Sequence, residues 1–203
     1  GIPPGDWSVR WRRKVASGAA AYRFRAVTDD GIKVSVGGET IINDFDEGPK
    51  DITFDAGVAR GNHEVQIDYW EHRGNAYAQV WWERVDNPNF ADWKGEYFPN
   101  RDLAGSPVLV RNDKKLSFKW QTKAPDPSLP ADNSSVRWTR RFDFEEGRYT
   151  FTASADDGIR VWIGDDRVLD KWGASAGPTK HTFERTLNGK KDIRVEYWDG
   201  HHN

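Results

Sequence analysis

The sequence contains an internal repeat, which limits the folds that the chain can adopt. Residues 6–45 align without a gap with residues 133–172, and 14 of the 40 aligned positions are identical. Further along, the pattern acidic-Tyr-Trp-acidic at residues 68–71 returns at residues 196–199. A pattern that returns over such a length is the signature of a repeated folding unit, in which each copy buries the same set of apolar side chains. The sequence therefore predicts two modules of one kind.

The two modules are cut at different points. The first spans residues 1–87 and the second residues 90–203, with a short join at 83–91. The stretch at 93–98 has no counterpart in the first module, and the stretch at 76–82 has none in the second. We therefore expect the first module to lack its opening hairpin and the second to lack its final strand. Either the chain is part of a longer tandem array, or a neighbouring subunit supplies the missing strand.

The local pattern of both modules is typical of β-strands. Tyr22, Phe24 and Ala26 alternate with more polar neighbours, and the same period of two recurs in the segments around residues 32–36 and 193–197. Glycines fall between short predicted strands, where hairpin turns require a positive φ. No stretch of ten or more residues has a period of 3.6. The predicted fold is all-β, with two tandem antiparallel β-sandwich or barrel modules and long loops.

Composition and charge exclude several classes of protein. Aromatic residues make up 13% of the chain and cysteine is absent, so the core must hold the fold without disulfides. A formal net charge of -2 gives no electrostatic basis for binding nucleic acid. The apolar stretches are far shorter than the ~20 residues of a membrane-spanning helix. We expect neither a nucleic-acid partner nor insertion into a membrane.

The sequence also gives no basis for catalysis. A glycosidase places two carboxylates on opposite sides of the scissile bond, about 5–10 Å apart. The repeated acids of this chain are adjacent to each other in predicted turns, which provides no such facing pair. No nucleophile elbow and no phosphate-binding loop is present in the sequence. We therefore expect a protein that is not an enzyme.

The spaced combination of repeated residues resembles the PA14 domain family, the β-barrel module of protective-antigen-type toxins, flocculin adhesins and accessory modules of secreted glycosidases. The residues that carry the resemblance in the second module are 93–98, 136–138, 149–163 and 195–198; in the first module they are 9–11, 29–31 and 76–82. The resemblance covers nearly the whole chain. It implies an extracellular or cell-surface, non-catalytic module that binds glycans or supports a neighbouring domain.

The resemblance also implies a calcium ion, held by an Asp-Asp pair in one loop and an Asn in a second loop. The matching residues are Asp29, Asp30 and Asn75 in the first module, and Asp156, Asp157 and Asn203 in the second. Calcium takes six to eight oxygen ligands, which suits carboxylates and an amide oxygen. Adjacent side chains of a strand point to opposite faces, so the pair converges only where the backbone turns sharply. The alternative is that Asp-Asp-Gly is a structural turn.

Residues near the same loops are candidates for contacting a glycan. They are Phe45, Glu71, His72, Trp172, Asp199 and His201. For the two aromatic residues, packing within a loop or the core is the favoured interpretation. The function that follows is calcium-dependent carbohydrate binding or adhesion, with a glycan or cell-surface polysaccharide as partner. The alternative is a structural repeat of a cell-surface or filament-forming protein that assembles with copies of itself by strand complementation.

Overall fold

The computed structural model describes residues 5–173 and 177–200, and within them every regular element is a β-strand. The prediction of an all-β fold is confirmed. The chain divides into two compact units, Gly1–Phe90 and Ala91–Asn203, which we call the first and the second unit. Because the described residues contain no helix, they contain none with the length and apolar character that crossing a membrane requires.

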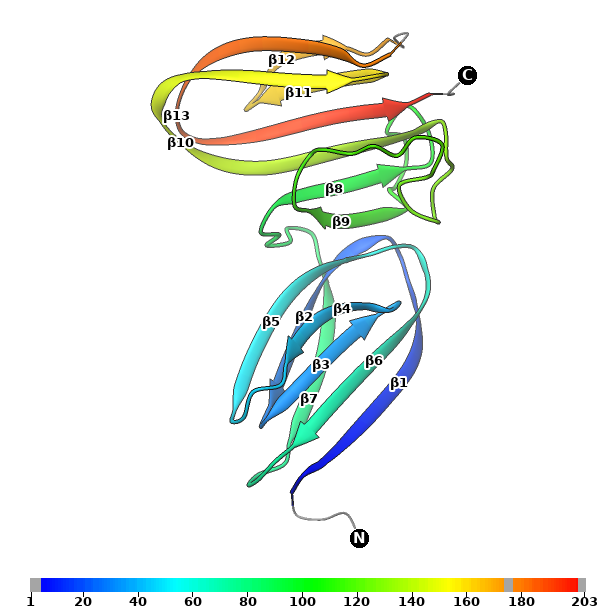
Figure 1. Ribbon diagram of the computed structural model, residues 1–203, viewed down its shortest axis with the longest axis vertical. Helices are drawn as coiled ribbons and strands as arrows, with labels where there is room; N and C mark the ends of the chain where they lie inside the picture. Colours follow the sequence, from blue (N-terminus) through cyan, green and yellow to red (C-terminus); the bar gives the residue numbers. More distant parts are fainter. Residues whose placement is uncertain (1–4, 174–176, 201–203) are drawn as a thin grey trace. The chain divides into compact units, whose positions relative to one another are not determined.

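The first unit is a sandwich of two antiparallel sheets (Figure 1). One sheet has the strand order β1-β6-β3-β4 and the other β5-β2-β7. The strands are β1 (Trp7–Ser17), β2 (Ala20–Thr28), β3 (Gly31–Val36), β4 (Glu39–Asp44), β5 (Lys50–Val58), β6 (Gly61–Glu71) and β7 (Ala78–Val85). Phe24 and Ala26 of β2 belong to the same buried cluster as Ile32 and Val34 of β3, so the core lies between the two sheets.

The second unit is built on one sheet, with the strand order β12-β11-β13-β10-β8-β9. Its strands are β8 (Trp93–Phe98), β9 (Leu109–Asp113), β10 (Ser134–Ala155), β11 (Gly158–Ile163), β12 (Asp166–Lys171) and β13 (Thr179–Asp199). Strands β10 and β13 are long and curved, and they pair with each other along most of their length (Figure 1). A β-bulge between Phe144 and Gly147 divides β10 into two halves.

The two units share much of their strand pairing. Val9 pairs with Tyr69 between β1 and β6, and Val136 pairs with Tyr197 between β10 and β13. The two halves of β10 therefore correspond to β1 and β2, and the two halves of β13 correspond to β5 and β6. The hairpin β8–β9 has no counterpart among the described strands of the first unit. Strand β7 likewise has none among those of the second.

Two details of the sequence prediction can be compared with the backbone. Gly37, Gly38 and Gly164 have positive φ values in the turns between short strands, as the hairpin pattern predicts. The join was expected to span residues 83–91, but its first three residues belong to β7, which continues to Val85. The cross-strand pairing of β7 with β2 holds these first residues of the expected join inside the sheet.

Candidate functional site

Three carboxylates converge at one end of the sheet of the second unit. Asp156 and Asp157 lie in the turn between β10 and β11, and Asp199 is the last residue of β13. Strand β13 runs between β10 and β11 and is antiparallel to both, so its end arrives beside the turn that joins them. One carboxylate oxygen from each residue lies within 4.8 Å of the others. No other such cluster of three occurs among the described residues.

Hydrogen bonds hold this cluster in place. The Tyr197 hydroxyl lies 2.8 Å from Oδ1 of Asp156 and 3.1 Å from Oδ1 of Asp199, and its single proton is shared between these two acceptors. The backbone N–H of Gly200 donates to Oδ2 of Asp157 at 2.7 Å. Burial, with the hydrogen bond to Asp156 next in importance, raises the pKa of Tyr197 well above its usual range. The tyrosine therefore remains a neutral phenol that donates to the carboxylates.

The donor set of the cluster fits a hard divalent cation. Calcium binds carboxylate oxygens in flexible geometry, and three carboxylates supply strong negative charge in a small volume. Asp199 retains only 5% of its accessible surface, so its carboxylate lies in an environment where unbalanced charge is costly. Sequence reasoning identified the Asp pair but placed Asp199 among the glycan contacts. The sequence feature that could have identified Asp199 is the pattern Tyr-x-acidic at the end of the last repeated strand. This pattern occurs at Tyr69 to Glu71 and at Tyr197 to Asp199.

A tryptophan fixes the turn that carries the Asp pair. A Cβ atom on Gly158 would lie 1.8 Å from Nε1 of Trp198, so only glycine allows the indole to approach this closely. The same Nε1 donates to the backbone carbonyl of Trp172 at 3.1 Å. The glycine of Asp-Asp-Gly is thus required by close packing, since its φ is not positive. In the first unit the positive φ of this turn belongs to Asp30, at 62°.

Asp30 in the first unit has a different role from the cluster in the second. Its Oδ1 accepts the backbone N–H of Gly48 at 2.8 Å, and its Oδ2 accepts that of His72 at 2.7 Å. These bonds, that of Gly48 first, lower the pKa of the buried Asp30 carboxyl. The ammonium of Lys50 lies 3.4 Å from the Asp30 carbonyl oxygen. Asp30 therefore ties the turn after β2 to two other loops, which agrees with the structural-turn interpretation.

Glu71 does not line a surface for a glycan. Its side chain is fully buried, and the Tyr69 hydroxyl donates to its Oε2. Its Oε1 is buried and has no hydrogen-bond partner. Burial first, and then Glu71, raises the pKa of Tyr69 above its usual range. Glu71 is the counterpart of Asp199 in the repeat. Among the described residues, however, Glu71, Asp29 and Asp30 do not form a cluster of carboxylates like that of Asp156, Asp157 and Asp199.

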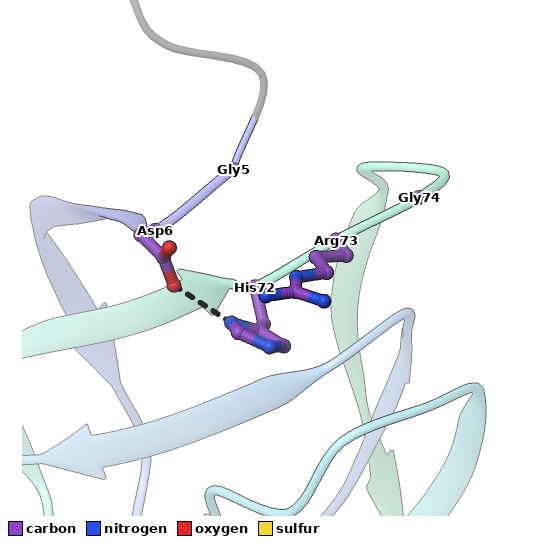
Figure 2. A pocket seen from close by; sticks show the side chains of 5 residues that line it. All are labelled: Gly5, Asp6, His72, Arg73 and Gly74. Atoms are coloured by element: carbon purple, nitrogen blue, oxygen red, sulfur yellow. Dashed lines mark hydrogen bonds and ion pairs between the residues drawn. The ribbon is translucent and has the colours of Figure 1, made fainter.

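His72 lines a shallow depression together with Gly5, Asp6, Arg73 and Gly74 (Figure 2). Its Nδ1 lies 2.7 Å from Oδ1 of Asp6, which Figure 2 marks with a dashed line. Its Nε2 lies 3.7 Å from Oε1 of Glu47. Both ring nitrogens thus face carboxylates of the same unit, and the ring ties the start of β1 to the loop after β6.

The remaining predicted site residues lie apart from the cluster or beyond the described part. Asp29 is half-buried, and its backbone N–H donates to the Tyr77 carbonyl at 3.0 Å. Asn75 and Phe45 are exposed. Trp172 is half-buried, and Cζ of Arg160 lies 4.3 Å from the centroid of the Trp172 ring. This contact agrees with the interpretation that Trp172 packs within a loop. The remaining two positions, His201 and Asn203, lie outside the described residues.

Comparisons with known proteins identify relatives of the chain. Residues 93–203 match the family model described as PA14 domain. A curated relative, anti-sigma-I factor RsgI3 of Acetivibrio thermocellus, is 26% identical over 223 aligned residues, which cover 97% of this chain and 34% of the relative. The chain thus spans about a third of the length of the curated relative it matches. Neither the matching family nor the name of this relative indicates catalysis.

Two solved structures are also similar. One is described as an anti-sigma factor domain-containing protein, with 24% identity and a TM-score of 0.48. The alignment with it covers 95% of this chain and 76% of that protein's chain. The other has the same description, comes from Clostridium clariflavum, and has 23% identity and a TM-score of 0.49. The alignment with it covers 95% of this chain and 75% of that protein's chain.

Proposed function

Because the match spans more than half of its residues, this chain belongs to the PA14 domain family, and we propose that it is an extracellular, non-catalytic ligand-binding region. In this proposal the first unit is a second PA14 domain that lacks the hairpin β8–β9. The internal repeat and the shared pairing of β1–β6 with β10–β13 support that assignment. The tandem arrangement then presents two related modules with different chemistry.

The observation that carries the proposal is the convergence of Asp156, Asp157 and Asp199. We propose that these three carboxylates hold a calcium ion in the second unit. The first unit does not fit the same role, because both carboxylate oxygens of Asp30 already accept backbone N–H groups. Calcium binding therefore belongs to one unit of the pair in this proposal.

A polysaccharide is the ligand class that this chemistry favours. A calcium ion with six to eight coordination positions keeps several of them for oxygen donors other than the three carboxylates. Neighbouring hydroxyl groups of a sugar are such donors. We propose a glycan or cell-surface polysaccharide as the partner of the second unit.

The relative gives this binding a biological setting. It is named as an anti-sigma factor, which is a regulatory protein, and its length is about three times that of this chain. We propose that the chain is the ligand-binding part of a larger regulator of that kind, rather than an adhesin.

Calcium titration by calorimetry on protein stripped with EDTA tests the metal site. We expect saturable binding of one ion per chain, loss of binding in Asp156→Asn, and unchanged binding in Asp29→Asn, which alters the equivalent position of the first unit. Each variant is first checked for its melting temperature. Absence of saturable heat, together with no rise in melting temperature on adding calcium, would reject the calcium site.

Co-sedimentation with insoluble polysaccharides tests the ligand class. The chain is expected to pellet with at least one of a panel of insoluble polysaccharides in calcium and to remain in solution in EDTA. The Asp156→Asn variant should behave in calcium as the unaltered chain does in EDTA. Calcium binding without any calcium-dependent pelleting would retain the metal site and reject the polysaccharide.

A further inference from the structure

The ammonium of Lys50 is enclosed by oxygen atoms in the first unit. Its Nζ donates to the backbone carbonyls of Asp46, of Gly48 at 3.1 Å and of Asp30 at 3.4 Å. Oδ1 of Asp44 lies 3.7 Å from the same nitrogen, and the Lys50 side chain is only 12% exposed. We call these three carbonyls and the Asp44 carboxylate the oxygen cage. An ammonium has three N–H donors, so the three carbonyls satisfy all of them.

The oxygen cage joins two segments of the first unit. Asp30 follows β2, whereas Asp46 and Gly48 lie between β4 and β5. The Asp30 N–H donates to the Gly48 carbonyl at 3.1 Å, and the Gly48 N–H donates to Oδ1 of Asp30 at 2.8 Å. Backbone carbonyls and carboxylates are the oxygen ligands that calcium takes in proteins. The ammonium therefore lies among donors that would also suit a free metal ion.

The second unit has no lysine at the equivalent position. In the first unit Lys50 pairs with Thr28. The counterpart of Thr28 in the repeat is Ala155, which pairs with Thr179. A Gly-Pro dipeptide precedes both Lys50 and Thr179. The Thr179 hydroxyl donates to the Gly177 carbonyl at 3.3 Å, so a neutral group takes the place that the ammonium has in the first unit.

The charge around the oxygen cage is negative without the lysine. Residues 44–50 contain three carboxylates and a single ammonium. Without that ammonium, the carbonyl dipoles and the carboxylate of Asp44 would face one point that holds no positive charge. Polar groups buried without a partner are costly, and a divalent cation at that point would remove the cost.

We propose that the Lys50 ammonium is the built-in cation of the first unit and that it occupies a site which, in its absence, binds calcium. The turn after β2 and the segment before β5 are then held together without a free ion. This inference concerns other residues than the calcium site proposed for the second unit, and it does not depend on that site.

Replacing Lys50 by the threonine of the second unit tests the site. Every chain in the experiment also carries Asp156→Asn, so that calcium at the triad of the second unit does not contribute. In EDTA, Lys50→Thr should lower the melting temperature of the first unit by at least about 4 °C. It should also speed hydrogen exchange at the amides of Asp30 and Gly48. Millimolar calcium should reverse both changes, and it should leave the chain that retains Lys50 unaffected.

Lys50→Met is the matched control for the loss of the lysine side chain. Methionine removes the charge, but its apolar side chain fills part of the space inside the oxygen cage and supplies no oxygen ligand. We expect Lys50→Met to be destabilised in EDTA as Lys50→Thr is, and to show no recovery in calcium.

Two further changes locate the ion. Asp44→Ala removes the carboxylate that lies 3.7 Å from Nζ. Asp46→Ala removes an exposed carboxylate of the same segment but keeps the backbone carbonyl that belongs to the oxygen cage. Each is combined with Lys50→Thr. The first combination should abolish the response to calcium, and the second should retain most of it.

The outcomes separate a cation site from a lysine that only packs. Recovery of Lys50→Thr in calcium that requires Asp44 and is absent in Lys50→Met supports the proposal. A Lys50→Thr chain that does not respond to calcium overturns it. Equal recovery in Lys50→Met also overturns it, because the ion would then lie elsewhere. Failure of the calcium site in the second unit would instead leave the unaltered chain without calcium binding, so the two proposals fail separately.

Discussion

Trp11 and Trp138 hold equivalent positions in the repeat, yet Trp11 exposes 47% of its surface and Trp138 only 4%. Both lie in strands paired in the same way, to Ile67 in β6 and to Val195 in β13. Trp138 pairs with Gly95 of β8 in the same sheet, and its Nε1 donates to Oδ2 of Asp113 in β9 at 2.8 Å. The ring of Phe118, in the segment after β9, stacks on it with centroids 5.4 Å apart. The hairpin β8–β9 and the segment that follows it are present in the second unit alone, and they give the same side chain two different environments.

The two tryptophans should respond very differently to truncation. We expect Trp138→Ala to lower the free energy of unfolding of the second unit by about 3–5 kcal/mol, because it removes a large buried ring and leaves Asp113 short of a donor. Trp11→Ala in the first unit should cost less than about 1 kcal/mol, since its ring is half in water. Urea unfolding followed by circular dichroism measures both. Equal costs would contradict the difference in burial.

The glycine of the Asp-Asp-Gly turn should tolerate no side chain in the second unit. We expect Gly158→Ala to destabilise the chain by about 1–3 kcal/mol, because the added Cβ would displace the Trp198 indole. The matched control is Gly173→Ala, where a Cβ would meet no atom within 4 Å. Thermal melting measures the stability of each variant. A shift in Gly173→Ala as large as that in Gly158→Ala would refute the packing argument.

Asp30 should make the stability of the first unit depend on pH. Its folded-state pKa lies below the unfolded value of about 3.9, so its contribution is complete above that value and is lost as pH falls through the folded pKa. Asp30→Asn should destabilise the unit by about 1–3 kcal/mol at pH 7. The side-chain NH2 group of asparagine would replace one of the two carboxylate oxygens, and it cannot accept the backbone N–H that this oxygen accepts. The difference from the unaltered chain should shrink as pH falls through the folded-state pKa of Asp30.

Melting curves between pH 2 and pH 7 measure this dependence. Asp51→Asn is the comparison, because Asp51 is an exposed carboxylate whose pKa is lowered by Arg25 rather than by backbone groups. Solvent screens that ion pair, so its removal should have a much smaller effect. A pH dependence in Asp30→Asn as steep as that of the unaltered chain would show that Asp30 is not the titrating group.

The strands and turns of this protein could be predicted because their signals are local. Alternation at Tyr22, Phe24 and Ala26 marks a half-buried strand wherever that strand lies in the chain. Glycines at positions 37 and 164 indicate hairpins for the same reason. The repeat extends the argument, since a second occurrence of the same alternation predicts the same strand.

The site was less predictable, because its members come from distant parts of the sequence. The adjacent acids Asp156 and Asp157 attract attention as a motif, but Asp199 joins them only through the pairing of β13 with β10 and β11. The same repeat position holds Glu71, which is fully buried against Tyr69. Equivalent positions in the repeat therefore have different surroundings in the two units.

Local sequence patterns were sufficient to predict the repeat, the strand character of each copy and the positions of the turns, because backbone conformation follows local side-chain sterics and polarity. Tertiary contacts were needed to establish which of two matching tryptophans is buried and which acids converge. These properties depend on strands that are far apart in the chain and meet only through sheet pairing. Burial and charge convergence are properties of that assembled surface, so no local pattern encodes them.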